Sequence, residues 1–374
     1  MFFILFLSPP THTDYSYLSL SLFFFFFLII FSLLLCVCVC REGGLLATLS
    51  GYYMMPWRVS FPATEEKATA VFQRMWKEHP RPIMATVTVM GGYFVFKGAA
   101  LLISRHMRNK LLATLKNLEK DTVHLFVHHR WSHGPNFFPH CVKIETFLRL
   151  EKIAYTVHFT SDASLSPTGR LPFIVYNGTI VGDSGPCMEY LKETLHLRLD
   201  DGLTPEDRAI GHVTRRMVET SLNYGLQRST LVDRPGLMQQ MFIKEYLVEP
   251  KMARRLVRSM RFKLVKALNT LGYNTLSEDQ YPQEFLHEVQ SLETLLSAKP
   301  FLLGNTPTSY DCTVYAWLHV AWEIGPHGPA IKYLRKSNVL SEYITRMKNL
   351  AFPDINELGT SSESQKFIPY KKQT

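Results

Sequence analysis

The chain has 374 residues, of which 46% are hydrophobic and 20% are charged, and these proportions exclude an intrinsically disordered chain. The formal net charge of +9 is a mild bias for this length, so it does not by itself indicate a nucleic-acid-binding protein. The length is sufficient for two domains or one large domain.

The six cysteines predict neither a disulfide framework nor a zinc site. Three of them lie in one apolar tract, at positions 36–40. The other three are far apart and form no Cys-x-x-Cys pair: Cys141, Cys187 and Cys312. This usage favours a reducing compartment for the folded part of the chain.

The N-terminal residues 1–53 allow two interpretations. Residues 18–40 carry no charged side chain and would span a bilayer as a helix. The same stretch holds three simple repeats, LSLSL, a run of five phenylalanines and CVCVC, which are typical of translated non-coding DNA. In the second interpretation, residues 1–53 are a mistranslated leader and the true start is Met54 or Met55.

A second apolar segment, Ile83 to Ser104, contains a single charged residue, Lys97. We predict that it is a transmembrane helix within a linker of residues 54–120. The alternatives are a buried core helix or two apolar strands that turn at Gly91-Gly92. Together with the free cysteines, an anchor here predicts a membrane-anchored protein with a cytosol-facing body. The protein would be cytoplasmic if the apolar segments do not cross a membrane.

From Asp121 onward the pattern is that of a folded domain. Residues 122–128 and 154–159 are rich in β-branched and aromatic residues, which predicts two strands. Between them, Cys141 to Leu150 has apolar residues with charged residues interspersed, which predicts an amphipathic helix. The three elements predict a βαβ unit with parallel strands.

The next stretch predicts a hairpin followed by a helix. Residues 173–176 and 179–181 are two short strand patterns joined by Asn-Gly, which is a strong signal for a two-residue turn. Ser184 then precedes a helical pattern and is a suitable N-cap, and amides at that helix start could hold an anion. The order of elements predicts a thioredoxin-like domain over residues 121–198.

This run resembles the N-terminal domain of glutathione transferases. In that family a Val-Pro or Leu-Pro strand with a cis-proline leads into a hairpin, and an acidic-Ser pair opens the next helix. Leu171-Pro172 and Asp183-Ser184 occupy those positions. The resemblance implies that Leu171, Pro172, Asp183 and Ser184 contact glutathione or a peptide-like ligand. Simple helix capping would also explain Asp183-Ser184 without any ligand.

The C-terminal part is similar to the same family. Helical patterns begin at Thr204, and Lys299 to Leu318 resembles the transferase C-terminal signature, which opens a buried helix. Thr308 and Asp311 have the spacing of a capping box. The fold class is therefore α/β plus all-α: a glutathione-transferase-like βαβ-ββα domain, then a helical domain over residues 199–358.

Within that superfamily, Pro139 to Val157 resembles the failed axon connections family. The metaxins are related to that family. The resemblance implies a non-catalytic protein that acts by binding in axon development. One alternative is a glutathione transferase or another thiol-dependent enzyme. The other is a metaxin-like component of mitochondrial outer-membrane import.

No catalytic residue is predicted. The family's Cys- or Ser-type donor would stand at Phe138, whose side chain cannot stabilise a thiolate. Cys141 falls where thioredoxins keep the second cysteine of their Cys-x-x-Cys motif, which is normally buried. Several polar residues could substitute for the donor, but none has the right spacing: Ser132, His133, Asn136 and His140. The histidines of this region show no recognisable metal-ligand pattern, so no metal site is predicted.

Lys251 to Lys266 contains seven basic residues and no acidic one. It predicts either the solvated face of a helix or contact with an anionic membrane surface. No nucleic-acid-binding module accompanies the charge, so no nucleic-acid partner is predicted. The sequence is compatible with a homodimer. The polar residues 359–374 are expected to form a disordered tail.

Overall fold

The structure is a computed structural model that describes residues 77, 80–277, 280–325, 327–355, 358 and 365–367. The apolar tract at 18–40 and both candidate start methionines lie outside the described residues. By its contacts the chain divides into two units, Met1–Gly92 and Tyr93–Thr374. The elements described below lie in the second unit, except for the first part of the long helix α3 (Pro80–Lys116).

The second unit contains a five-stranded sheet in the order β4-β3-β1-β2-β5. Strands β1 and β2 run parallel, β3 pairs antiparallel with β1, and β3 and β4 form the predicted hairpin. The strand bounds are β1 (Val123–Val127), β2 (Tyr155–Phe159), β3 (Phe173–Tyr176), β4 (Thr179–Gly182) and β5 (Gln365–Phe367). The predicted βαβ-ββα order is confirmed.

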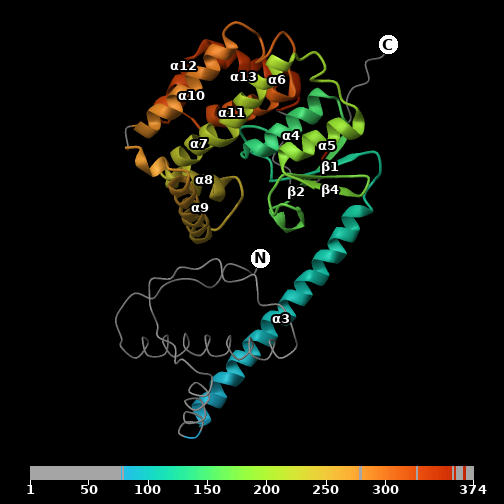
Figure 1. The fold of residues 1–374 in the computed structure, drawn as a ribbon, viewed down its shortest axis with the longest axis vertical. Helices are drawn as coiled ribbons and strands as arrows, with labels where there is room; N and C mark the ends of the chain where they lie inside the picture. The colour runs from blue at the N-terminus through green and yellow to red at the C-terminus, as the bar shows by residue number, and fades with distance from the viewer. Residues whose placement is uncertain are drawn as a thin grey trace, which may run out of the picture. The chain divides into compact units, whose positions relative to one another are not determined.

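Alternation along β1 places different side chains on the two faces of the sheet. Val123, Leu125 and Val127 pack against α4 (Pro139–Leu150) and α5 (Ser184–Leu195), which lie side by side in Figure 1. On the opposite face, Phe126 packs with the C-terminal end of α3 and with the short helix η1 (Ala163–Leu165). A two-sided core of this kind explains why every residue of β1 is buried.

The helical part follows α5, as predicted. Thr204 caps its first helix through a hydrogen bond from the Asp207 amide, and a proline stands in the first turn. The helices are α6 (Pro205–Met217), the π-helical η2 (Val218–Leu222), α7 (Asn223–Leu231), α8 (Pro235–Lys244), α9 (Pro250–Thr270), the 3-10 helix η3 (Tyr273–Thr275), α10 (Gln280–Leu296), α11 (Ser309–Glu323), α12 (Gly328–Lys336) and α13 (Asn338–Ala351).

Helix α11 is buried along almost its whole length because it contacts both the sheet domain and the other helices. Its start has the predicted capping arrangement: the Asp311 carboxylate accepts hydrogen bonds from Thr308 N at 2.8 Å and Thr308 Oγ1 at 2.7 Å. The same carboxylate accepts one from Leu302 N at 2.8 Å, which ties the preceding loop to the helix. The residues of the transferase-like C-terminal signature therefore hold the preceding loop against the start of α11.

Helix α4 differs from the sequence prediction. It was expected to be amphipathic, but all residues from Cys141 to Arg149 are buried, because α5, α11 and α13 contact the helix in addition to the sheet. The charged residues of the helix are accommodated by ion pairs. Lys143 Nζ lies 2.5 Å from Glu219 Oε1, and Glu145 pairs with Arg130.

The Glu145 carboxylate is the centre of a buried polar cluster. Arg130 donates two hydrogen bonds to it, at 2.6 and 2.7 Å, and the Tyr155 hydroxyl donates a third at 2.9 Å. Arg149 donates to the Tyr155 hydroxyl at 2.7 Å and to Asp354 Oδ1 at 2.5 Å. Burial opposes ionisation of Glu145, but the charge and hydrogen bonds of Arg130 outweigh it and lower the pKa of Glu145.

The predicted membrane segment 83–104 is helical, so the alternative of two strands turning at Gly91-Gly92 is wrong. Within the described part of the chain, however, no helix combines the length and the apolar character needed to cross a bilayer. The prediction of a transmembrane helix is therefore not supported. Glycines, threonines and Lys97 interrupt the apolar side chains of this segment.

The C-terminal region contains an element that the sequence analysis did not anticipate. Within the predicted disordered tail 359–374, Gln365–Phe367 form β5, which pairs antiparallel with β2. Arg130 Nε donates to Gln365 Oε1 at 3.1 Å, and the guanidinium of Arg149 lies 4.5 Å from the centroid of the Phe367 ring. Contacts to the two arginines of the buried cluster therefore position this short strand.

A first prediction concerns the buried cluster. Replacing Arg130 with methionine should lower the free energy of unfolding by about 3–5 kcal/mol, because it leaves the Glu145 charge buried without its main partner. Urea denaturation of the full chain measures the change. Arg198→Met is the control: its side chain is 88% exposed and lies 3.9 Å from Asp201, so a change below about 0.5 kcal/mol is expected. Equal effects of the two substitutions would contradict this interpretation.

A second prediction concerns close packing at Gly134. A Cβ atom at this position would lie 2.3 Å from Nε2 of His319, a buried side chain whose ring stacks on Tyr315. Gly134→Ala should therefore destabilise the fold by about 1–3 kcal/mol in thermal or urea denaturation. Gly304 occupies the corresponding position of a similar β-bridge, and a Cβ there would meet no atom within 4 Å, so Gly304→Ala should be nearly neutral. A neutral Gly134→Ala would refute the prediction.

Candidate functional site

The fold brings the four predicted ligand contacts together at the start of α5. The β3–β4 hairpin pairs Phe173 with Gly182, so the residues that flank this pair, Pro172 and Asp183, become neighbours. Asp183 N donates a hydrogen bond to Pro172 O at 3.0 Å. The Leu171-Pro172 peptide bond is cis, as the sequence resemblance predicted.

Asp183 stands at the N-cap position but does not cap the helix. Its side chain makes no capping hydrogen bond, and within the described residues no hydrogen bond to its carboxylate is found. Its backbone has a φ of 75°, a conformation that costs a non-glycine residue of order 1–3 kcal/mol. Capping therefore does not account for an aspartate here. Strain and an uncapped carboxylate are features found at ligand-binding positions.

Ser184 is buried beside Asp183, and its Oγ lies 3.5 Å from Nδ1 of His140 on α4. The rings of His140 and Trp317 are nearly perpendicular, with centroids 4.7 Å apart. Burial lowers the pKa of His140, although the charge of Asp183 acts in the opposite direction. A neutral imidazole thus lies between the start of α4 and the start of α5.

The position of the family's thiolate-stabilising donor is apolar. Phe138 is the N-cap residue of α4 and makes no side-chain capping bond. Its ring packs on His128 at 4.1 Å between centroids and on Phe137 at 5.4 Å. Cys141, one turn further along, is fully buried, and burial raises the pKa of its thiol to about 12. Phe138 thus offers no donor to a thiolate, and the thiol of Cys141 is buried and stays protonated at neutral pH.

The histidines of β1 and β2 pair with each other. His124 Nδ1 and His158 Nε2 lie 3.0 Å apart, and His124 Nε2 lies 3.0 Å from the Glu119 carbonyl oxygen. Among the described residues, no group of three or more His, Cys, Asp or Glu side chains could hold a metal ion. These contacts between the two rings and the backbone explain the presence of His124 and His158 without a metal ion.

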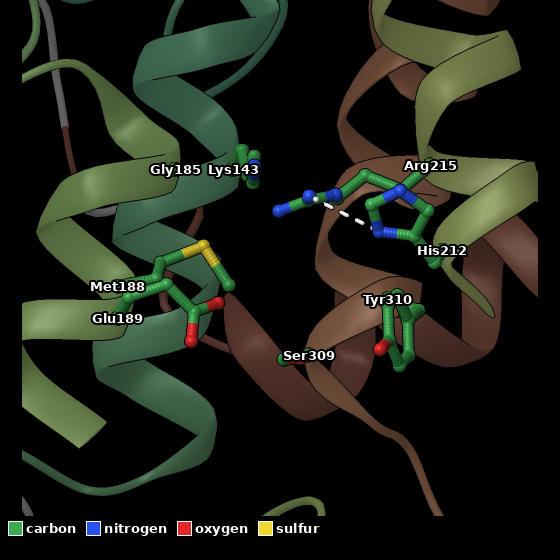
Figure 2. Close-up of a pocket in the computed structure, with 8 residues that line it drawn as sticks. All are labelled: Lys143, Gly185, Met188, Glu189, His212, Arg215, Ser309 and Tyr310. Carbon is green, nitrogen blue, oxygen red and sulfur yellow. Dashed lines mark hydrogen bonds between the residues drawn. The ribbon is translucent and has the colours of Figure 1, made fainter. Parts of the chain in front are cut away.

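A cavity of about 250 Å³ lies next to the predicted contacts, between the sheet domain and the helical domain (Figure 2). Four helices contribute to its wall: α4, α5, α6 and α11. The lining residues are Lys143, Gly185, Met188, Glu189, His212, Arg215, Ser309 and Tyr310. No local sequence pattern marks this site, because its residues are spread over most of the folded chain.

Two family models match the chain, both by description glutathione S-transferase domains. The N-terminal domain model matches residues 139–234, and the C-terminal domain model matches residues 286–350. The chain is therefore similar to both domains of glutathione S-transferases. This similarity agrees with the thioredoxin-like sheet followed by a helical domain.

This chain is similar to three informative relatives. It is 27% identical to Failed axon connections of Drosophila melanogaster over 272 residues, which is 68% of this chain and 63% of that protein, less than two thirds of its length. It is 29% identical to isoprene-epoxide–glutathione S-transferase of a Rhodococcus strain, over 50% of this chain and 82% of that protein. Metaxin-2 of Mus musculus is 21% identical, over 47% of this chain and 67% of that protein.

Helix α9 contains the predicted basic stretch. Its apolar side, with Ala253, Val257, Leu264 and Leu268, is buried, whereas the basic side chains are exposed. Phe262 lies among them with 73% of its surface exposed. The helix therefore has the solvated basic face that the sequence allowed, and contact of this face with an anionic membrane stays a prediction.

A third prediction concerns pH. Burial lowers the pKa of His128 to about 4 and that of His319 to about 3. Between about pH 6.5 and 4 the unfolded chain binds protons that the folded chain does not, so stability should fall as pH falls, by up to ~1.4 kcal/mol per pH unit and group. Urea denaturation at pH 7 and pH 5 measures this.

His319→Phe should reduce the pH dependence, because it removes one buried group that titrates only in the unfolded chain. His287→Gln, at an exposed position on α10, is the control and should leave the pH dependence unchanged. If His319→Phe and the parent protein lose the same free energy between pH 7 and pH 5, the assignment is wrong.

Proposed function

We propose that this protein is not a transferase but a binding protein, with a role in axon connections of the kind its Drosophila relative's name describes. The observation that carries the proposal is Phe138. A glutathione thiolate requires a hydroxyl, thiol or positive group beside it, and a phenyl ring at the start of α4 supplies none.

The predicted contacts are suited to the end of a peptide-like ligand. The Asp183 carboxylate, free of capping bonds, would attract an ammonium group, while the amides at the start of α5 would attract a carboxylate. A zwitterionic amino-acid end carries both groups. Glutathione and other peptide-like ligands fit this description, and Leu171, Pro172, Asp183 and Ser184 are the proposed contacts.

A glutathione-dependent enzyme is the second candidate. It is favoured by the similarity to a bacterial glutathione S-transferase along 82% of that protein's length. In this case His140, whose Nδ1 lies 3.5 Å from Ser184 Oγ, would be a candidate partner for a bound thiol. The similarity to metaxin-2 also leaves a metaxin-like role in mitochondrial import, which would require a tagged full-length chain to localise to mitochondria.

A fourth prediction tests the proposed function. The full chain should show no conjugation of glutathione to chlorodinitrobenzene above the uncatalysed rate. Phe138→Ser places a hydroxyl at the family's donor position and should produce measurable turnover if glutathione binds, whereas Phe138→Ala removes the ring without adding the donor and should not.

Glutathione binding and turnover, measured together, decide between the binding protein and the enzyme. Calorimetry with reduced glutathione should show binding that Asp183→Ala weakens at least tenfold, while Asp201→Ala, at an exposed site, leaves it unchanged. Turnover by the unmodified chain that disappears in Asp183→Ala would overturn the non-catalytic proposal. Absence of any binding would remove glutathione as the ligand.

A further inference from the structure

The cavity of Figure 2 has the composition of a small anion site. Its volume of about 250 Å³ is below the roughly 300–1,000 Å³ of typical small-molecule sites, so it suits a ligand smaller than a tripeptide. None of the proposed glutathione contacts lines it. Its charged and polar groups therefore have to be explained separately.

Arg215 has the clearest unmet hydrogen-bonding capacity in the cavity. Its Nε is buried without a partner, and Nη2 has only a long contact of 3.5 Å to His212 Nδ1. No carboxylate of the described chain forms a salt bridge with it. Figure 2 shows its guanidinium reaching from α6 across the cavity. Buried donors are normally satisfied, and the guanidinium fork matches the two oxygens of an oxyanion.

Two further groups favour an anion beside Arg215. Lys143 is buried and its ammonium pairs with Glu219, which leaves donors for a second acceptor. Its Nζ would lie 4.0 Å from a Cβ at Gly185, in the first turn of α5, and Asp183 does not cap that helix. The ammonium group of Lys143 and the uncapped start of α5 thus both favour an anion on the same side of the cavity.

Two acidic groups near the cavity, Glu189 and Asp200, are already paired. Glu189 lines the wall, but its side chain is 58% exposed and lies 3.2 Å from Lys192 Nζ. At the start of α11, Ser309 N and Oγ donate to the Asp200 carboxylate at 2.9 and 2.6 Å, which shows one anion already held at this helix start. Of the charged residues that line the cavity, Lys143 and Glu189 have ion pairs and Arg215 has none in the described part of the chain.

We propose that this cavity binds a small oxyanion, a carboxylate or a phosphate group, with Arg215 as its main anchor and Lys143 as a second donor. The inference goes beyond the proposed function and does not depend on glutathione binding. Carboxylate and phosphate ligands share the chemistry that a guanidinium recognises, and the test separates them.

The experiment titrates the full chain with inorganic phosphate and, separately, with acetate, at an ionic strength held constant with sodium chloride. Calorimetry or a thermal shift should detect saturable binding of at least one probe, and the tighter probe identifies the ligand class. Arg215→Gln should weaken it at least tenfold. Arg216→Gln, the exposed neighbour on the same helix, and Asp183→Ala should leave it unchanged.

A second variant covers the case in which Arg215→Gln does not fold. Gly185→Leu places a side chain into the cavity at a position where the nearest atom is the flexible end of Lys143, so the protein should fold and lose the anion. Absence of saturable binding by the parent chain would overturn the proposal. So would unchanged binding in folded Arg215→Gln or in Gly185→Leu. Loss of glutathione binding in Asp183→Ala with phosphate or acetate binding intact would show that the two sites are independent.

Discussion

The ionised carboxylate of Glu145, buried in the middle of the sheet domain, is the constraint on which much of the structure depends. A charge in this position is tolerated only if donors surround it, and Arg130, Tyr155 and Arg149 do so. These residues come from the loop after β1, from β2 and from α4 itself. The carboxylate therefore fixes the orientation of α4, and with it the placement of Phe138 and His140 at the helix start.

The local elements of the sheet domain could be predicted from sequence because their signals are local. The Asn-Gly turn, the two short strand patterns at 173–176 and 179–181 and the Leu-Pro step predicted a hairpin that the structure contains. The burial of α4 could not be predicted in the same way. Its charged residues looked solvated because their partners lie far away in sequence: Glu219 is 76 residues from Lys143, and Asp354 is 205 residues from Arg149.

The candidate site was predicted only in part for the same reason. Leu171, Pro172, Asp183 and Ser184 meet because one hairpin register brings them together. The cavity with Arg215 is assembled by four helices that no local pattern links, so only the tertiary structure reveals it. The proposed ligand contacts meet at the start of α5, while the position of the family's thiolate-stabilising donor is occupied by Phe138, whose ring packs on His128 and Phe137.

Strand β5 has a consequence for association between molecules. It covers β2, which would otherwise be a free edge of the sheet with unpaired amides and carbonyls. Free edges of this type can recruit strands from other chains. Residues 365–367 thereby cover an edge to which strands of other molecules could pair. Proteolytic removal of these residues would expose β2 and favour sheet formation between molecules.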